Sequence, residues 1–262
     1  MHLYPNGYYN YLQHCKDARE KRKAAILKHI ETIFHEAQGR PGYRMMQKLL
    51  QAKGIFLSLQ TVRKYMNVEL GLKSITRRKK RYIKPKQDPY AIFQNLYNQD
   101  FTAERRNQRW CIDFTYLYFG KHKKRYNCTI IDLYDRRVVA SVNGKNIDAQ
   151  LAITTVAEAI RRSNGEVCDF LHSDRGSQFT SKAFIEFCKN NGIQQSMSKP
   201  GYPYDNAPME RYYNTLKTEL IYQKKFRTEE ELYTEVNAYA YGWYNNLRPH
   251  MSNGGLAPAK VN

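Results

Sequence analysis

The sequence of 262 residues contains no run of about 18 apolar residues, the length that a membrane-spanning helix requires. Its first residues have neither the basic segment nor the apolar segment of a secretory signal. Sustained heptads, internal repeats and low-complexity segments are also missing, which excludes coiled-coil and fibrous proteins. Because 42% of the residues are hydrophobic and 13% aromatic, we expect a globular protein of one or two domains. The missing membrane and signal segments predict a cytosolic or nuclear protein.

Cysteine is scarce and scattered. The five cysteines include no CxxC pair, so the sequence predicts neither a zinc site nor a disulfide framework. We expect them to be small core residues: Cys15, Cys111, Cys128, Cys168 and Cys188.

Acidic residues are too few to balance the basic ones. The chain has 24 Asp and Glu against 43 Lys and Arg, which gives a net charge of +19 and an isoelectric point near 9.6. Residues 1–109 carry 23 basic and 8 acidic side chains, while residues 110–262 carry 20 and 16. Such an excess indicates a polyanionic partner, with nucleic acid as the first candidate. The alternative is a basic region that serves only solubility or unspecific adhesion.

The N-terminal part has the apolar periodicity of three helices, over residues 16–37, 43–54 and 61–70. In the third, Arg63 and Lys64 are predicted to point outward. Three short helices with a basic third helix favour a DNA-binding region at 1–72 of the helix-turn-helix type, whose third helix would enter the major groove. A small helical bundle without DNA contact has the same periodicity.

A basic segment follows within a linker that we place at residues 73–104. The run LKSITRRKKRYIKPK contains no acid, and its proline opposes a continuous helix. We expect it to contact DNA phosphates, although a solvated connector or a localisation signal has the same composition. The predicted contacts are Arg77, Arg78, Lys79, Lys80 and Arg81.

From Trp110 onward the pattern changes to strands. Three β-rich runs come first, and helical and strand patterns then alternate in the order α-β-α-β-α. The last helices are expected near 209–222 and 229–246. This order predicts a mixed α/β fold, with a sheet flanked by helices.

Three acids occupy informative places in this region. Asp113 lies in the middle of the first predicted strand, Asp174 ends a short strand, and Glu210 lies at the start of a helix. If these positions converge, oxygen ligands without His or Cys suit Mg²⁺, with Mn²⁺ as a substitute. Two such ions can promote phosphodiester displacement. Taken singly, each acid fits a turn, a cap or an ion pair equally well.

The spacing of these acids resembles that of a known family. Sixty residues separate Asp113 from Asp174, and 35 separate Asp174 from Glu210, with Lys217 seven positions further on. Together with WCIDFTYL, HSDRGSQF, DNAPME and a terminal RPH followed by GGLAP, this pattern resembles the DDE transposases and retroviral integrases. It is most similar to the second-reading-frame transposases of the type-three bacterial insertion-sequence family.

The resemblance implies an RNase H-like core at 105–225, followed by a C-terminal helix and tail at 226–262. It implies that Asp113, Asp174 and Glu210 bind two Mg²⁺ ions and that Lys217 contacts DNA. The implied activity is polynucleotidyl transfer, in which hydrolysis at insertion-sequence ends is followed by strand transfer in DNA transposition. The alternatives are a DNA-binding regulator without catalysis and an RNase H-like nuclease.

The same resemblance implies the partners and the setting. The DNA would comprise the terminal inverted repeats of the element and its target, in the cytoplasm of a bacterium and associated with the nucleoid. A homodimer or larger oligomer on DNA is expected, as is an upstream-frame partner or fusion.

Residues around these motifs are open to two interpretations. His172 fits either a group that positions water or DNA, or a polar core residue. Tyr212 and Tyr213 lie close to Glu210 in the sequence, where their rings would stack on unpaired bases or pack in the core. Arg248 and His250 are predicted to stabilise the fold, with DNA contact as the alternative.

Overall fold

The computed structural model describes residues 5–75, 93–121, 123–199 and 203–261. Two compact units are distinguished, Met1–Thr76 and Arg77–Asn262. The predicted contacts from Arg77 to Arg81 lie outside the described residues. Among the described residues, no helix is both long enough and apolar enough to cross a membrane.

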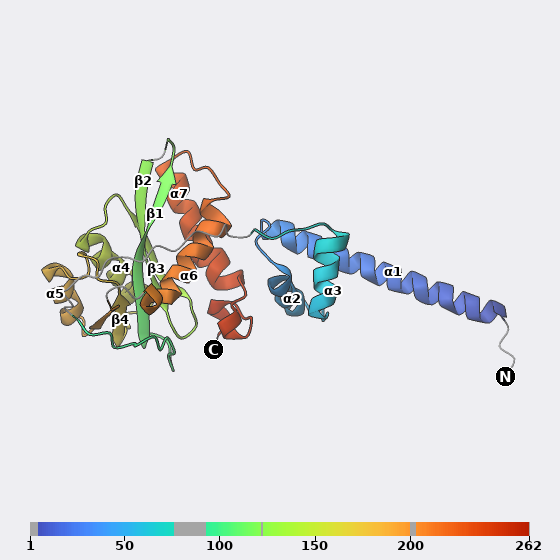
Figure 1. Ribbon diagram of the computed structural model, residues 1–262, viewed down its shortest axis with the longest axis horizontal. Helices are drawn as coiled ribbons and strands as arrows, with labels where there is room; N and C mark the ends of the chain where they lie inside the picture. The colour runs from blue at the N-terminus through green and yellow to red at the C-terminus, as the bar shows by residue number, and fades with distance from the viewer. Residues whose placement is uncertain (1–4, 76–92, 122, 200–202, 262) are drawn as a thin grey trace. The chain divides into compact units, whose positions relative to one another are not determined.

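The first unit is all helical (Figure 1). It consists of α1 (Pro5–Glu36), α2 (Tyr43–Ala52), α3 (Leu59–Lys64) and the π-helical turn η1 (Tyr65–Glu69) that extends α3. Its core lies where α2 and α3 pack on α1, and the residues that are buried there include Ile30, Met46, Leu50, Val62 and Met66.

Local sequence signals set the ends of these helices. The Ser58 hydroxyl accepts a hydrogen bond from the Thr61 N–H at 3.1 Å, which caps α3. Gly39 follows α1 with a φ of +73°, a conformation that glycine adopts without strain. The helix predicted at 16–37 starts eleven residues earlier than expected, at Pro5, because proline is favoured in a first helical turn and no later proline interrupts the helix.

The second unit is built around a five-stranded mixed sheet in the order β3-β2-β1-β4-β5. An antiparallel meander comes first, formed by β1 (Arg109–Phe119), β2 (Lys123–Asp132) and β3 (Val138–Gly144). The short strands β4 (Phe170–Ser173) and β5 (Gln194–Met197) extend the sheet in parallel with β1. The predicted order of strands and helices is confirmed.

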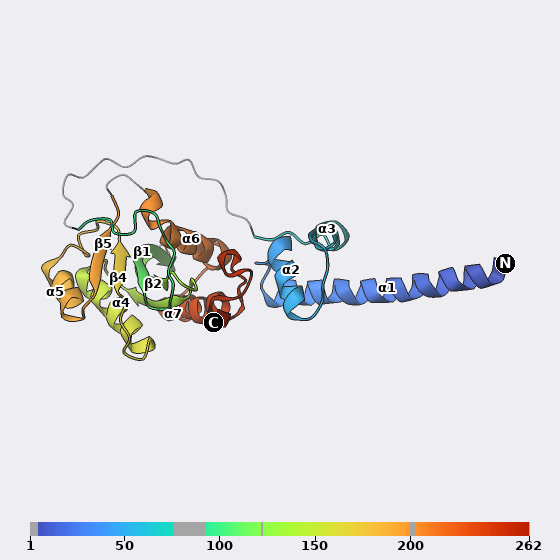
Figure 2. The same ribbon diagram turned by 90° about the horizontal axis from the view of Figure 1, so that it is seen from below.

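Helices cover both faces of this sheet (Figure 2). One face is covered by α4 (Ala149–Arg162) and α5 (Lys182–Asn190), which bury Trp110 and Ile112 of β1. The other is covered by α6 (Ala207–Leu216) and α7 (Glu229–Asn237), with their π-helical extensions η3 (Lys217–Ile221) and η4 (Ala238–Leu247). Short 3₁₀ turns complete the unit at η2 (Pro203–Asn206), η5 (Met251–Asn253) and η6 (Pro258–Lys260).

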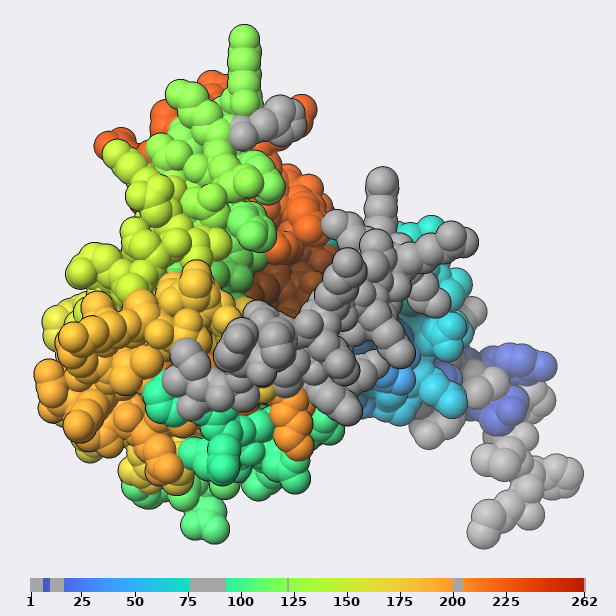
Figure 3. Space-filling view, turned by 60° about the vertical axis from the view of Figure 1, so that its left-hand side comes forward, coloured from blue at the N-terminus to red at the C-terminus, as the bar shows by residue number. Residues whose placement is uncertain are grey.

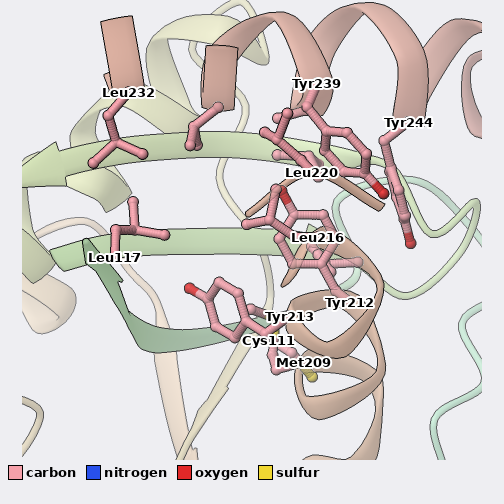
Figure 4. Close-up of a cluster of buried hydrophobic side chains, with 14 of the residues drawn as sticks. Cys111, Leu117, Met209, Tyr212, Tyr213, Leu216, Leu220, Leu232, Tyr239 and Tyr244 are labelled. Carbon is pink, nitrogen blue, oxygen red and sulfur yellow. The ribbon is translucent and has the colours of Figure 1, made fainter. Parts of the chain in front are cut away.

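The second face holds a tyrosine-rich core (Figure 4). Cys111 and Leu117 reach it from β1, because successive side chains of a strand point to opposite faces. Tyr212 and Tyr213 are buried there, so core packing is the correct interpretation of both rings.

A buried ion pair joins the end of the chain to this layer. The Arg248 Nη2 atom lies 3.0 Å from Glu219 Oε1, and Glu219 also accepts hydrogen bonds from Tyr239 and Trp243. Arg248 therefore stabilises the fold, as predicted.

Candidate active site

Asp113 and Asp174 lie on neighbouring strands. The parallel register of β1 and β4 pairs Trp110 with Leu171 and Cys111 with His172. Two residues further along this register, Asp113 falls beside Asp174, which directly follows β4. Adjacent strands are about 4.8 Å apart, and positions two residues apart share a face. The sheet therefore brings both carboxylates to the face that is covered by α6.

Glu210 reaches this face from the first turn of α6, which begins with Ala207 and Pro208. The Tyr213 hydroxyl donates to the main-chain carbonyl of Asp113 at 2.6 Å and lies 3.2 Å from the Asn127 carbonyl. Residues three apart on a helix share a side, so Glu210 lies on the side of α6 that Tyr213 fixes to β1. In Figure 3 the orange atoms of the α6 region are recessed between the green hairpin of β1 and β2 and the gold region of β4 and α5.

The three carboxyl groups share one electrostatic environment. The pKa of Asp113 is raised to about 8, first because the protein desolvates its carboxyl and then because Asp174 and Glu210 are negatively charged. A hydrogen bond from the Phe114 N–H at 2.7 Å and the positive charge of Lys217 oppose this rise. The structure thus brings Lys217, at the start of η3, close enough to act on Asp113.

The pKa of Asp174 is also raised, and desolvation is the main cause. Its Oδ1 atom accepts a hydrogen bond from the Gly176 N–H at 2.9 Å, which opposes the rise. The residue is nevertheless solvent-exposed, so its carboxyl is accessible even though the surrounding protein removes part of its hydration.

Asp205 organises the turn that leads into α6, a role that the sequence analysis missed. Its buried carboxylate accepts hydrogen bonds from Asn95 Nδ2 at 2.7 Å, from Gln99 Nε2 at 3.0 Å and from the Lys199 N–H at 2.8 Å. The donors Asn95 and Gln99 lie more than 100 residues away in the sequence, so no local pattern predicts this contact. Five residues after Asp205, the chain presents Glu210.

His172 is a polar core residue. Its ring is fully buried, lies 2.8 Å from the Ser196 hydroxyl and 3.1 Å from that of Ser198, and stacks on Tyr97. Burial lowers its pKa to about 4, so the imidazole is neutral at pH 7. Of the two predicted roles for His172, the structure supports packing.

The donor set suits a hard divalent cation, because it consists only of carboxylate oxygens. Within the described residues, no three His, Cys, Asp or Glu side chains converge closely enough to hold an ion. Asp113 and Asp174 each accept a hydrogen bond from the adjoining main chain. The residues match a metal site in the chemistry of their oxygens and in the face that they share, but they do not converge to the distances of bound ligands.

The predicted DNA contacts Arg63 and Lys64 belong to the first unit, whereas the three carboxylates belong to the second. Arg63 and Lys64 are exposed in the last turn of α3, as the periodicity predicted. The Arg63 guanidinium lies 5.9 Å from the centre of the Tyr43 ring, a cation–π distance.

Both units match known protein families. Residues 103–203 and 191–258 each match an integrase core domain, and residues 21–80 match an HTH-like domain. One solved structure with a similar chain is a simian T-cell lymphotropic virus intasome in complex with PP2A regulatory subunit B56 gamma. The TM-score is 0.50 at 16% identity, covering 82% of this chain and 69% of that one. This likeness concerns the fold, and the expected integrase-like core is confirmed.

Relatives of similar sequence are transposases. The chain is 34% identical over 250 residues to the probable transposase for insertion sequence element IS1353 of Shigella flexneri, covering 95% of this chain and 48% of that protein. It is 32% identical over 238 residues to the transposase for insertion sequence element IS904 of Lactococcus lactis, covering 90% of this chain and 93% of that protein. The chain thus spans about half the length of the first relative and nearly all of the second. It belongs to the type-three family of insertion-sequence transposases, which carry an integrase core domain.

Proposed function

We propose that this protein is a DNA transposase whose second unit cleaves insertion-sequence ends and joins them to target DNA. Asp113, Asp174 and Glu210 would be its catalytic carboxylates. The observation that carries the proposal is that Asp113 and Asp174 lie on the face of the sheet that α6 covers with Glu210. There, desolvation first and then the charges of Asp174 and Glu210 raise the pKa of Asp113 to about 8. Carboxylates held close together destabilise the protein on its own, but they favour the binding of cations.

These carboxylates would hold two Mg²⁺ ions, or Mn²⁺ in their place. Ions bound there would activate an attacking oxygen and stabilise the leaving oxygen of a phosphodiester. The chain itself would supply orientation: β1 and β4 hold Asp113 and Asp174 side by side, and the Tyr213 hydroxyl fixes α6 to the Asp113 carbonyl. The Asp113 carboxyl would give up its proton when a cation binds.

Basic residues would guide DNA to this site. Lys217 lies close enough to the carboxylates to lower the pKa of Asp113, and from there it would contact a phosphate next to the scissile bond. Arg63 and Lys64 would contact terminal repeats from α3, and residues 77–81 would follow the backbone between the regions. We infer four regions: DNA-binding 1–72, linker 73–104, core 105–225 and C-terminal tail 226–262.

Joining two DNA ends to one target requires two active sites, so we infer that the protein acts as a dimer or larger oligomer on DNA. The intasome that its fold resembles is itself an assembly. An upstream-frame product would supply further recognition of the ends.

The test incubates the purified chain with labelled element-end duplex and Mg²⁺, Mn²⁺ or Ca²⁺, and resolves nicked and joined strands on a denaturing gel. We expect products with Mg²⁺ and Mn²⁺. Asp174→Asn should bind the DNA as wild type does and form no product. Asp169→Asn, which alters an acid at the opposite end of β4 that pairs with Arg105, is the matched control and should cleave normally. Full cleavage by Asp174→Asn would contradict the assignment, and cleavage of RNA–DNA hybrid alone would favour a nuclease.

A further inference from the structure

A cavity in the second unit lies beside the first turn of α6. It has a volume of about 330 Å³, and its walls include Phe101, Arg136, Pro208, Arg211, His250 and Met251. We call it the arginine pocket. Arg211 follows Glu210 directly, and consecutive helical residues point about 100° apart. The pocket therefore lies next to the candidate active site, around the side of the same helix.

The charge in this pocket is positive, and the carboxylates of Asp132 and Asp135 act on Arg136 only from beyond ion-pair distance. Within the described part of the chain, neither Arg136 nor Arg211 has a carboxylate within ion-pair distance, and no acid lines the pocket. The Arg136 Nη2 atom donates to the Phe101 carbonyl at 2.8 Å. The pKa of His250 is lowered to about 4 by burial and by the charges of Arg248, Arg136 and Arg211, so its ring adds no charge at pH 7.

The acids nearest to Arg136 in the sequence are engaged elsewhere. Asp132 accepts hydrogen bonds from the N–H groups of Asn107 at 2.7 Å and Tyr134 at 2.8 Å. Asp135 pairs with Arg106 at 3.0 Å and accepts from the Arg137 N–H. A half-buried guanidinium without a carboxylate partner is costly, and an anion from outside the chain would offset that cost.

The remaining walls are apolar. Phe101 and Pro208 line the cavity, and Met251 has 66% of its surface exposed at the rim. A ligand that fits both the arginines and the apolar side chains has an anionic group attached to a flat or apolar body. Nucleotides have this composition, and a base can enter a pocket only after it has left the duplex stack.

We propose that the arginine pocket binds one unpaired nucleotide of the DNA substrate, with its phosphate against Arg136 and Arg211 and its sugar and base against Phe101, Pro208 and Met251. The inference rests on the proposed function, because it requires DNA at the adjacent carboxylates. It assigns a use to the RPH motif: Arg248 fixes the end of η4 to Glu219, and His250 forms part of the pocket wall.

The test compares two fluorescein-labelled probes by anisotropy on the full chain without divalent metal. One is a blunt 20-base-pair duplex and the other is the same duplex with a three-nucleotide single-stranded overhang. We expect wild type to bind the overhang probe several-fold more tightly. Arg211→Ala should abolish this preference and reduce the slope of log K against log salt by about one, as expected for one lost phosphate contact.

Two further variants separate the parts of the pocket. Met251→Ala should reduce the overhang preference and leave the salt slope unchanged, because it removes apolar contact only. Arg227→Ala is the matched control, since Arg227 is an exposed arginine of the same unit outside the pocket. It should behave as wild type.

The outcomes for the pocket and for the proposed function are distinguishable. Equal binding of both probes by wild type, or an unchanged preference and salt slope in Arg211→Ala, would overturn the pocket. If wild type cuts element ends in Mg²⁺ while this happens, the transposase assignment stands. An arginine-dependent overhang preference in a protein that never cuts DNA would support the pocket and remove the catalytic proposal.

Discussion

Replacing Asp113 with Asn should stabilise the metal-free protein at pH 8. The pKa of Asp113 is raised to about 8 in the folded chain, whereas an unfolded aspartate titrates near 3.9. Between these values the folded protein holds a proton that the unfolded chain has lost. Wild type is therefore expected to lose stability as the pH rises through this interval. Asparagine has no proton to lose and can still accept the Phe114 N–H bond.

The size of the effect follows from the same interval. One group that differs by one proton changes the free energy of unfolding by about 1.4 kcal/mol per pH unit, or about 4 kcal/mol from pH 5 to pH 8. Asp113 is only half-buried, so solvent screening reduces this to about 1–2 kcal/mol. For a unit of this size, we expect Asp113→Asn to raise the melting temperature by about 2–8 °C at pH 8 and by much less at pH 5.

Differential scanning calorimetry in EDTA at pH 5, 6.5 and 8 measures this trend. Asp169→Asn is the control, because it removes an acid that is 42% exposed and paired with Arg105 at the surface. Its effect should be below about 0.5 kcal/mol and independent of pH. If Asp113→Asn is destabilised equally at pH 5 and pH 8, the pKa of Asp113 is not raised in the folded protein and the reasoning fails.

Three further predictions concern the anchoring of α6. Tyr213→Phe removes the hydroxyl bonded to the Asp113 carbonyl, and it should cost about 1 kcal/mol in urea unfolding and lower the cleavage rate at saturating DNA. Tyr212→Phe, whose hydroxyl has no partner among the described residues, should change neither. Arg248→Met leaves the Glu219 charge buried and should cost about 3–5 kcal/mol, largely recovered by adding Glu219→Gln; no recovery would contradict the pairing. In Asp205→Asn, an NH₂ group would face the N–H donors of Asn95 and Gln99, and one hydrogen bond would be lost. This variant should have a lower melting temperature and no cleavage activity. Cleavage at the wild-type rate would refute the role of Asp205.

The sequence predicts the elements well where the signals are local. The alternation along β1 and the apolar spacing of α4 and α5 each act within about ten residues, so the order of strands and helices follows from pattern alone. The predicted start of α1 was wrong, because residues 5–15 lack the apolar periodicity of the later turns and only Pro5 marks the first turn.

The contacts that support the site have no such local signal. Asp205 and Asn95 meet across 110 positions, and Tyr213 reaches the Asp113 carbonyl across 100. Arg136 is one of many arginines in the sequence, and only the fold reveals that it lines a cavity without a carboxylate partner. Spacing therefore predicts which acids are candidates, while the groups that hold them in place require coordinates.

The position of Glu210 depends on three anchors along one helix. Asp205 fixes the turn before α6, the Tyr213 hydroxyl joins its middle to β1, and Glu219 in η3 binds Arg248 near the end of the chain. All three lie in buried or half-buried surroundings, where hydrogen bonds are stronger than in water. Loss of the Asp113 proton would add a charge beside Asp174 and Glu210, and these anchors would hold α6 in place against the repulsion. We therefore expect variants that loosen one anchor to retain DNA binding by the first unit while they lose cleavage, since the helix would shift Glu210 without unfolding α3.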